Sequence, residues 1–486
     1  MTVEQHGTRL GLVTGATGYV GSNVVTELLD RGWAVRTLSR SRDKALSMPW
    51  GERIVPEGTS ARAGQVEVVE GDASAAEDVK RALSGAHTAW YLLHSMSSGD
   101  DFMRDEKQMA ETFGAAARAA GIRRLVFLGG LHPDDKELSE HLASRVAVGE
   151  VLIDSGVPTA ALQAGVVLGA QSSSFQMLRH LSERLPGAIG PSWIQHEITP
   201  ISVRDAVFYL ASAADLPEDV NRTFDIGGPD TLPYIDMMKR YARTWGKIPR
   251  VVITAPVTTP QLASYWISLV TPVDRSLISP LISSLLHDTV LEERDLEAMV
   301  GRPPGGNQSF EEAVHDALDR PRTRRWTKVF TGVSLAVGAC AVLGSTLTDP
   351  KNSWYQSLEL PSWQPPAALF PWAWSALYVD IAAISALAIA DLLENDDRRG
   401  ARRHAAALGV NLALNAGWPG MFFRSKKPAL STVWAAALTA SSIDMVRRAH
   451  RSSPERGVLL APYAAWSGFA TVLNGAIARR NRPNKR

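Results

Sequence analysis

Cysteine is almost absent from this sequence. The 486 residues include one cysteine, Cys340, which lies inside an apolar run. A single thiol cannot build a disulfide framework or a cysteine-based metal site within one chain. This composition is typical of a protein that folds in a reducing cytoplasm.

A secretory leader is also missing from the first residues. The N-terminus, MTVEQHGTRLGLVTGATGYVG, has no basic segment followed by an apolar region and a small-residue cleavage site. We therefore expect the front of the chain to stay in the cytoplasm.

Neither sign of charge is in excess. The 51 Lys and Arg residues oppose 50 Asp and Glu, a formal net charge of +1, which implies no nucleic-acid partner. The mean hydropathy of -0.06 suits an ordinary soluble protein. That average hides a division, because eight of the fourteen tryptophans follow Thr323. The length likewise favours two or three domains.

A glycine-rich turn follows the first apolar run. Residues 10–14 lead into TGATGYVG, and residues 22–30 carry apolar side chains at helical spacing. This order of strand, turn and helix is typical of dinucleotide binding. Gly15 permits the tight turn, Gly18 lets the backbone approach a pyrophosphate, and Gly21 lets helix and strand pack closely. A purely structural turn is the alternative.

The end of the second strand indicates which dinucleotide is bound. Residues 34–38 run into SRSR, without the acidic residue that would accept hydrogen bonds from an NAD ribose. The guanidinium of Arg40 suits a 2′-phosphate in charge and in geometry, so we expect NADP(H) to be preferred over NAD(H). Arg42 is a second candidate, and a solvated surface cation is the alternative for Arg40.

Three more strand-then-loop patterns predict the fold of this part. They are residues 66–69 before GDAS, 88–93 before HSM and 124–128 before GG, with helical stretches between them. The alternation predicts an α/β domain with a parallel, doubly wound sheet. Because the carboxyl ends of such strands share one edge, Asp72, His94 and Gly129 should border the cofactor crevice. A hydrogen-bonded structural histidine is the alternative for His94.

Residues 8 to about 320 resemble the atypical short-chain dehydrogenase/reductase family, specifically its NmrA-like, NAD(P)H-binding members. The resemblance rests on TGATGYVG, GDAS, YLLHSMSSGDDF, LVFLGGLHPD and FDIGGPDTLPYIDMM. It implies a Rossmann domain in which the dinucleotide is contacted by Gly15, Thr17, Gly18, Tyr19, Gly21, Arg40 and Asp72.

The chain departs from this family at the catalytic pair. Active members place a Tyr and a Lys four residues apart, where the Tyr supplies a proton and the Lys lowers its pKa. After LGGLHPDDKELSE this chain has His141 and Arg145. Arginine can orient a ribose, and a histidine can donate a proton near neutral pH. Loss of turnover with retention of the cofactor, as in NmrA-like redox sensors, is the alternative.

Two segments separate this part from the end of the chain. Residues 250–290 are apolar but broken by proline, so we expect them to cap the substrate side rather than to span a bilayer. Three positions are open to Tyr265 and Trp266 there: the lining of an apolar pocket, the membrane surface or a packed core. Residues 301–325 form a plausible linker between residues 1–300 and a membrane domain at 326–486.

Five apolar stretches follow the linker, at about 329–347, 369–392, 405–423, 428–446 and 457–478. Each approaches the roughly 20 residues that cross about 30 Å of hydrocarbon. They predict an all-α, five-helix transmembrane bundle, with buried helices of a soluble domain as the alternative. Thirteen Lys and Arg residues flank the near ends and nine the far ends. This bias favours a cytoplasmic N-terminus.

The tail from about Trp326 resembles the TspO/MBR family of tryptophan-rich sensory or translocator proteins. WYQSLELPSWQPP, LFPWAWSALY, NLALNAGWPGMFF and PYAAWSGFATVLN occur in the family's order. The resemblance implies a bundle, often a homodimer, that binds porphyrins and other flat apolar ligands from the lipid bilayer. Carried over by position, its pocket contains Trp354, Tyr355, Trp363, Trp374, Tyr378, Asn415, Trp418, Tyr463, Trp466, Ala470 and Asn474.

The residue types support this assignment in part. Trp and Tyr offer large faces for stacking, and amides among apolar helices mark a ligand site or a helix contact. An interfacial anchor is the alternative for any single Trp. Two function classes follow from the sequence: an NADPH-dependent reductase acting on an apolar ligand, and a non-catalytic sensor that couples NADP(H) state to ligand binding or transport.

Overall fold

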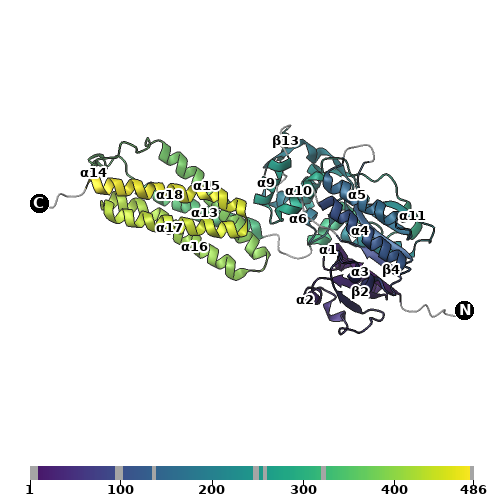
Figure 1. The fold of residues 1–486 in the computed structure, drawn as a ribbon. Coiled ribbons are helices and arrows are strands. Elements are labelled where there is room, and N and C mark those ends of the chain that lie inside the picture. Colours follow the sequence, from purple (N-terminus) through teal and green to yellow (C-terminus); the bar gives the residue numbers. More distant parts are fainter. Residues whose placement is uncertain are drawn as a thin grey trace. The chain divides into compact units, whose positions relative to one another are not determined.

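The computed structural model describes residues 9–93, 102–133, 138–185, 187–244, 251–255, 260–318 and 325–481. The chain divides into two compact units. The first unit comprises Met1–Ile267 and Val273–Asp319, and the second comprises Ser268–Pro272 and Arg320–Arg486. In Figure 1 most of the first unit runs from purple to teal and most of the second from green to yellow.

A seven-stranded sheet, in which all paired strands are parallel, forms the centre of the first unit. Its strand order is β11-β6-β5-β4-β1-β2-β3. The strands are β1 Leu10–Thr14, β2 Ala34–Ser39, β3 Val66–Glu70, β4 Thr88–Tyr91, β5 Arg124–Gly130, β6 Thr159–Ala164 and β11 Arg222–Ile226. Three small pairs accompany the sheet, namely β7 Val167–Leu168 with β10 Ile201–Ser202, β9 Glu197–Ile198 with β12 Leu232–Pro233, and β8 Gly187–Pro191 with β13 Val251–Ala255. The predicted parallel sheet is confirmed.

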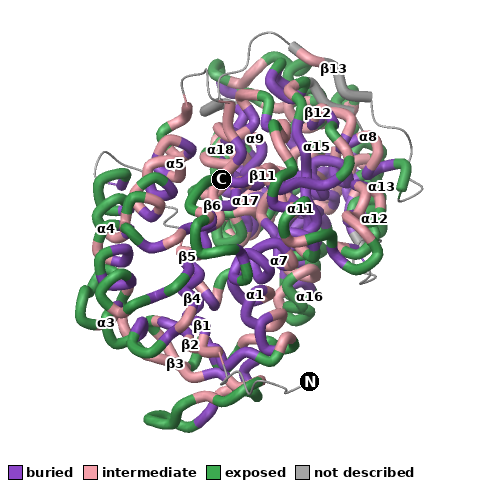
Figure 2. Tube along the Cα trace, turned by 90° about the vertical axis from the view of Figure 1, so that its right-hand side faces the viewer, coloured by how far each residue is buried: buried purple, intermediate pink, exposed green. Residues whose placement is uncertain are grey.

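Helices cover both faces of this sheet (Figure 2). The described helices of the first unit are α1 Tyr19–Asp30, α2 Arg42–Leu46, η1 Gly51–Arg53, α3 Ala76–Leu83, α4 Phe102–Ala119, α5 Glu140–Ile153, α6 Ser173–Arg184, η2 Ser192–Gln195, α7 Val203–Ser212, η3 Ala213–Asp215, α8 Tyr234–Thr244, α9 Pro260–Val270, α10 Arg275–Ser283, α11 Asp295–Val300 and α12 Phe310–Leu318. The end of α9, from Ser268, belongs to the second unit. One core packs Leu28 of α1 and Leu210 of α7 against the strands. The opposite core packs Phe113 of α4 and Leu152 of α5.

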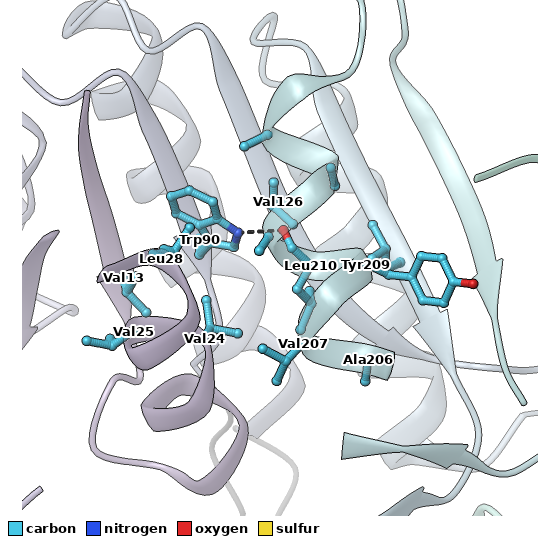
Figure 3. Packing of buried hydrophobic residues seen from close by; sticks show 14 of the residues in the cluster. Val13, Val24, Val25, Leu28, Trp90, Val126, Ala206, Val207, Tyr209 and Leu210 are labelled. Atoms are coloured by element: carbon cyan, nitrogen blue, oxygen red, sulfur yellow. Dashed lines mark hydrogen bonds between the residues drawn. The ribbon is translucent and has the colours of Figure 1, made fainter. Parts of the chain in front are cut away.

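Trp90 on β4 links the sheet to helix α7. Its buried indole Nε1 donates to the carbonyl of Leu210 at 2.8 Å (Figure 3). Gly11 on β1 makes room for the ring, because an ideal Cβ there would lie 2.7 Å from it. A buried indole N–H with a partner avoids the cost of a lost hydrogen bond. The contact fixes the position of β4, whose carboxyl end borders the expected cofactor crevice.

Part of the predicted linker belongs to the first unit. The backbone N–H of Gln308 donates to the carboxylate of Asp205 at 2.7 Å, and Phe310 of α12 is buried. The prediction of a linker over residues 301–325 is therefore wrong for residues 308–318. The physical reason is that a short acidic helix shows its apolar face in a sequence but not the surface that buries it.

The second unit is helical in its described part. Its helices, apart from the end of α9, are α13 Arg325–Leu347, α14 Ser353–Gln356, α15 Leu369–Glu394, α16 Arg398–Pro419, the π-helical η4 Gly420–Arg424, α17 Pro428–Ser452 and α18 Pro454–Arg480. Each of the five predicted apolar stretches lies within one of the long helices, with η4 extending α16. Their mutual packing buries a core around Ile384, Leu412 and Tyr463.

Three of these helices are long and apolar enough to cross a membrane. They are Trp326–Leu347, Leu369–Glu394 and Pro428–Ser452. Large apolar side chains point outward from them, including Leu335, Val379 and Val433. Outward apolar surface on a helix of this length is typical of contact with lipid.

Candidate functional site

The glycine turn between β1 and α1 has the shape that a dinucleotide needs. Gly15 has φ +67°, and an ideal Cβ there would lie 2.3 Å from the carbonyl oxygen of Leu92. A Cβ on Gly21 would lie 2.3 Å from the carbonyl oxygen of Gly15. Only glycine fits either position, so the turn brings the backbone close to α1 and to the end of β4.

The first turn of α1 keeps its backbone donors open. Gly18 precedes the helix, and no described side chain caps its N-terminus. The unpaired N–H groups and the helix dipole favour an anion such as a pyrophosphate. The site lies where the chain order reverses, because β1 is flanked by β2 on one side and β4 on the other. The residues present therefore fit a dinucleotide.

Tyr19 and Thr17 are half-buried in this turn. The hydroxyl of Tyr19 reaches the segment after β7, since an ideal Cβ on Gly169 would lie 2.2 Å from it. Burial raises the pKa of Tyr19, although backbone hydrogen bonds from Gln171 and Ala170 oppose that effect. The phenol thus joins the turn to the neighbouring segment.

The two arginines after β2 differ in their partners. Arg42 donates to the carbonyl of Val55 at 2.8 Å. Arg40 is exposed and makes no hydrogen bond or ion pair with any described residue. Asp72 is also exposed, and its carboxylate accepts from the N–H and hydroxyl of Ser74 at 2.9 and 2.8 Å. These bonds, followed by the charge of Arg40, hold the pKa of Asp72 below its usual value.

The carboxylate of Asp72 therefore stabilises its own turn, and Arg40 is the side chain left available for a ligand. His94, the remaining predicted cofactor residue, lies outside the described residues.

Arg145 is committed to the ends of two strands. Its guanidinium donates to the carbonyl of Leu93 at 3.1 Å and to the carbonyl of Leu128, and it lies 4.6 Å from the centre of the Phe127 ring. Burial lowers the pKa of Arg145, and the buried Glu106 opposes that effect. Arginine remains protonated under these conditions. The side chain thus ties β4 to β5.

His141 lies one turn earlier on α5, stacked on Phe102 with ring centres 6.4 Å apart. Burial, and after it the charge of Arg145, lowers the pKa of His141 to about 4. The imidazole is therefore neutral at pH 7, and a neutral imidazole is a poor acid. This environment disfavours a proton-donating role for His141 near neutral pH, and that role stays a prediction.

A cavity of about 290 Å³ lies beside Arg145, between α5 and strands β5, β6 and β11. His132 and Gln163 line it and are joined by a 3.2 Å contact between their side-chain nitrogens. Neither was predicted as a site residue. The signal for His132 is its place just after β5, where side chains meet at the carboxyl edge of a parallel sheet.

Most of the predicted aromatic residues of the second unit lie in linked clusters. Trp354, Tyr355 and Trp418 surround Phe422 and Phe423, and the Trp418 and Phe422 rings stack with centres 5.3 Å apart. The other cluster contains Trp374, Tyr378, Tyr463 and Trp466. Phe370 and Phe469 connect the two, because both contact Trp466, at 5.8 and 5.5 Å.

The remaining predicted residues differ in their surroundings. Trp363 is 46% exposed and contacts Phe469, and Ala470 is half-buried. Asn474 donates to the hydroxyls of Ser431 at 3.0 Å and Thr432 at 2.8 Å. Asn474 is thus a contact between α17 and α18, one of the two roles considered for it.

Asn415 joins two aromatic residues. It accepts from the hydroxyl of Tyr378 at 2.8 Å and donates to the hydroxyl of Tyr463 at 3.2 Å. Three predicted ligand residues therefore bond to one another across α15, α16 and α18.

A model of the TspO/MBR family matches residues 330–480. The tryptophan-rich protein TspO of Chlorobaculum tepidum is 31% identical over 154 residues, which cover 31% of this chain and 95% of that protein. The chain belongs to the TspO/MBR family.

The first unit matches a different family. An NAD(P)H-binding family model covers residues 15–164. A (4-alkanoyl-5-oxo-2,5-dihydrofuran-3-yl)methyl phosphate reductase of Streptomyces griseus is 25% identical over 237 residues, 49% of this chain and 74% of that protein. A solved triphenylmethane reductase of Citrobacter sp., complexed with NADP(H), is 18% identical over 63% of this chain and all of that one, with a TM-score of 0.49. The chain is thus an NAD(P)H-binding Rossmann domain fused to a TspO/MBR domain with membrane helices.

Four aromatic residues of the TspO/MBR domain escaped the sequence-based set. They are Phe370, Phe422, Phe423 and Phe469, all in contact with predicted residues. Their spacing was the available signal, because Phe370, Phe422 and Phe469 lie three or four residues from a predicted Trp on the same helix or on its π-helical extension. Phe423 directly follows Phe422.

Gly21→Ala should weaken NAD(P)H binding by at least about tenfold, because the added methyl group must displace the Gly15 carbonyl that shapes the turn. Isothermal titration of the full-length protein with NADPH measures this. Gly32→Ala is the control: its φ is also positive, at +81°, but nothing lies within 4 Å of the added Cβ. It should lower stability and leave binding unchanged. Equal loss of binding in both variants would contradict the assignment.

The low pKa of His141 should also appear in the stability of the protein. An unfolded histidine titrates near 6.5, whereas His141 in the folded chain has a pKa of about 4. Between these values the unfolded state binds the extra proton, so His141 destabilises the fold as the pH falls from 6.5 to 4. Thermal unfolding should show a smaller loss of stability over this range in His141→Phe. An NMR titration midpoint near 6.5 would refute the assignment.

Proposed function

We propose that this protein is a membrane-embedded NADP(H) sensor that binds a porphyrin or a similar flat apolar ligand in its TspO/MBR domain. The observation that carries the proposal is the presence in one chain of an intact glycine turn and an ordered aromatic set. The turn offers backbone donors to a pyrophosphate, and the aromatic rings offer faces to a flat ligand.

Five membrane spans and a cytoplasmic first unit are part of this proposal. Helices α16 and α18 have 22 and 27 residues, and at about 1.5 Å per residue either length reaches across about 30 Å of hydrocarbon. The arginines at the start of α16 can extend along the helix into the headgroup region. The excess of Lys and Arg on the near side supports the orientation. We further infer that two copies pair through this domain.

A non-catalytic sensor, which couples the NADP(H) state to ligand binding, fits the first unit better than a reductase does. In the usual catalytic positions, His141 is neutral at pH 7 and Arg145 is bonded to the carbonyls of Leu93 and Leu128. Residues of the glycine turn and Arg40 would hold the dinucleotide, which supplies a hydride when it reacts. With a pKa lowered to about 4 by burial, His141 is poorly suited to supply a proton for such a reaction.

Reduction is the second candidate function, because the relative from Streptomyces griseus is a reductase. The cavity beside Arg145 would then admit a substrate that takes its proton from water.

Arg40→Ala should lower the affinity for NADPH by about tenfold and leave the affinity for NADH unchanged, since a charge-assisted hydrogen bond to the 2′-phosphate is lost. Fluorescence titration of the full-length protein with both cofactors measures the ratio. Arg42→Ala is the matched control, because Arg42 is bonded to Val55. A wild-type protein that prefers NADH would contradict the proposal.

The double variant Trp374→Ala, Trp466→Ala should lose at least about 100-fold in affinity for protoporphyrin, since two large stacking faces disappear. Quenching of the remaining Trp fluorescence in lipid nanodiscs measures it. Trp372→Ala is the control, because Trp372 lies on the same helix as Trp374 and is 79% exposed. Unchanged affinity in the double variant would remove these residues from the site.

A further inference from the structure

Helices α16 and α17 of the TspO/MBR domain pack side by side and run in opposite directions. Trp434 Nε1 on α17 donates to the carbonyl of Leu414 on α16 at 2.7 Å, and Asn411 Nδ2 donates to the hydroxyl of Ser441 at 3.1 Å. The contact thus moves back along α16 as it moves forward along α17. The first turns of α16 therefore lie beside the last turns of α17.

Arginines from both helices meet at this end of the contact. Arg403 lies eleven residues, or about three turns, before Leu414, so both lie on the side of α16 that approaches α17. On α17, Arg448 follows Ser441 by seven residues, which is about two turns. Arg399 and Arg451 lie about one turn further toward this end. The arginine cluster is defined here as Arg399, Arg403, Arg448 and Arg451.

The arginine cluster carries more positive charge than its neighbours neutralise. Arg448 Nε donates to Asp444 Oδ2 at 2.6 Å. The carboxylate of Asp397, at the start of α16, accepts from the backbone N–H of Gly400 at 2.8 Å. The other three arginines are exposed, and their side chains make no hydrogen bond or ion pair with a described residue. An anion placed among them would relieve their mutual repulsion.

The exposed surface next to the cluster is apolar. Val410 lies seven residues after Arg403 on the same side of α16 and is 59% exposed. Ala440 lies eleven residues before Arg451 on the same side of α17 and is also exposed. A soluble anion would match the arginines alone. An acidic phospholipid matches both the charge and the apolar surface, because its headgroup and its acyl chain are joined.

We propose that the start of α16 and the end of α17 form a binding site for an acidic phospholipid. Arg399, Arg403 and Arg451 hold its phosphate, since a planar guanidinium offers paired donors to phosphate oxygens. The acyl chain lies along Val410 and Ala440. The inference rests on the membrane spans that the proposed function assigns to α16 and α17.

Phosphatidylglycerol and phosphatidylcholine with identical acyl chains form a matched pair of probes, because they differ in headgroup and net charge. Full-length protein in detergent micelles is titrated with each lipid, and the bound lipid is counted by native mass spectrometry. We expect phosphatidylglycerol to bind the wild type about tenfold more tightly than phosphatidylcholine. Free glycerol phosphate at the same concentration should not displace it.

The double variant Arg403→Ala, Arg451→Ala should reduce this preference to about twofold or less, since two of the three phosphate contacts are lost. Arg398→Ala, Arg402→Ala is the matched control. Both control arginines are exposed, lie on another side of α16 and make no side-chain hydrogen bond or ion pair with a described residue. This variant removes the same charge from the same end of the bundle and should keep the preference.

Three results would overturn the lipid site. The first is equal affinity of the wild type for both lipids, and the second is displacement of phosphatidylglycerol by glycerol phosphate, which would identify a site for a soluble anion. The third is an equal loss of preference in both double variants, which would reduce the effect to general surface charge. Protoporphyrin binding in the same samples separates these outcomes from failure of the proposed function. Intact protoporphyrin binding confines the failure to the lipid site, whereas loss of both removes the proposed function as well.

Discussion

The arginine, amide and phenol side chains buried near the two expected sites bond to partners within their own unit, and this constraint determines what each unit can do. A polar group taken out of water without a partner costs about 1–3 kcal/mol, so a fold retains few of them. In the Rossmann domain the guanidinium of Arg145 satisfies the strand-end carbonyls of Leu93 and Leu128. In the TspO/MBR domain the Tyr378 and Tyr463 hydroxyls donate hydrogen bonds to the side-chain amides of Asn415 and Asn411. What remains for a ligand is set by which atoms these bonds leave open.

In the Rossmann domain, the open groups are backbone donors. The glycine turn exposes the first N–H groups of α1, and Arg40 makes no hydrogen bond or ion pair with a described residue. At the usual catalytic positions, the imidazole of His141 is neutral at pH 7 and the guanidinium of Arg145 is bonded to backbone carbonyls. This arrangement suits a dinucleotide, and His141, at the usual acid position, has a pKa far below 7. In the TspO/MBR domain the groups that suit a flat ligand are aromatic faces.

Local patterns in the sequence predicted much of this structure. The strand, turn and helix around Gly15 depend on residues close in the chain, and the structure has them as β1 and α1. The long apolar stretches after residue 325 were equally easy to recognise, because the length of an apolar run is a property of a single segment. The strand order was not predicted, since the edge strand β11 pairs with β6 from about 60 residues earlier.

The missed features depend on contacts between distant residues. The low pKa of His141 follows from burial and then from the charge of Arg145, and Phe102, which stacks on His141, lies 39 positions away. The hydrogen bond between Asn411 and Tyr463 likewise joins two helices. Asn474 was placed in the ligand pocket by its position in the family, with a helix contact as its other possible role, and it bonds Ser431 and Thr432. Composition indicates that a buried amide needs a partner, but only the fold identifies it.

The central claim is that the Rossmann domain binds NADPH without consuming it. Its most direct test is to follow NADPH absorbance in the presence of full-length protein in nanodiscs, with protoporphyrin and a panel of quinones, after fluorescence has established that the cofactor is bound. We predict binding and no oxidation beyond the rate without protein. Sustained NADPH oxidation that requires one of these compounds and disappears in Gly21→Ala would contradict the account and establish a reductase.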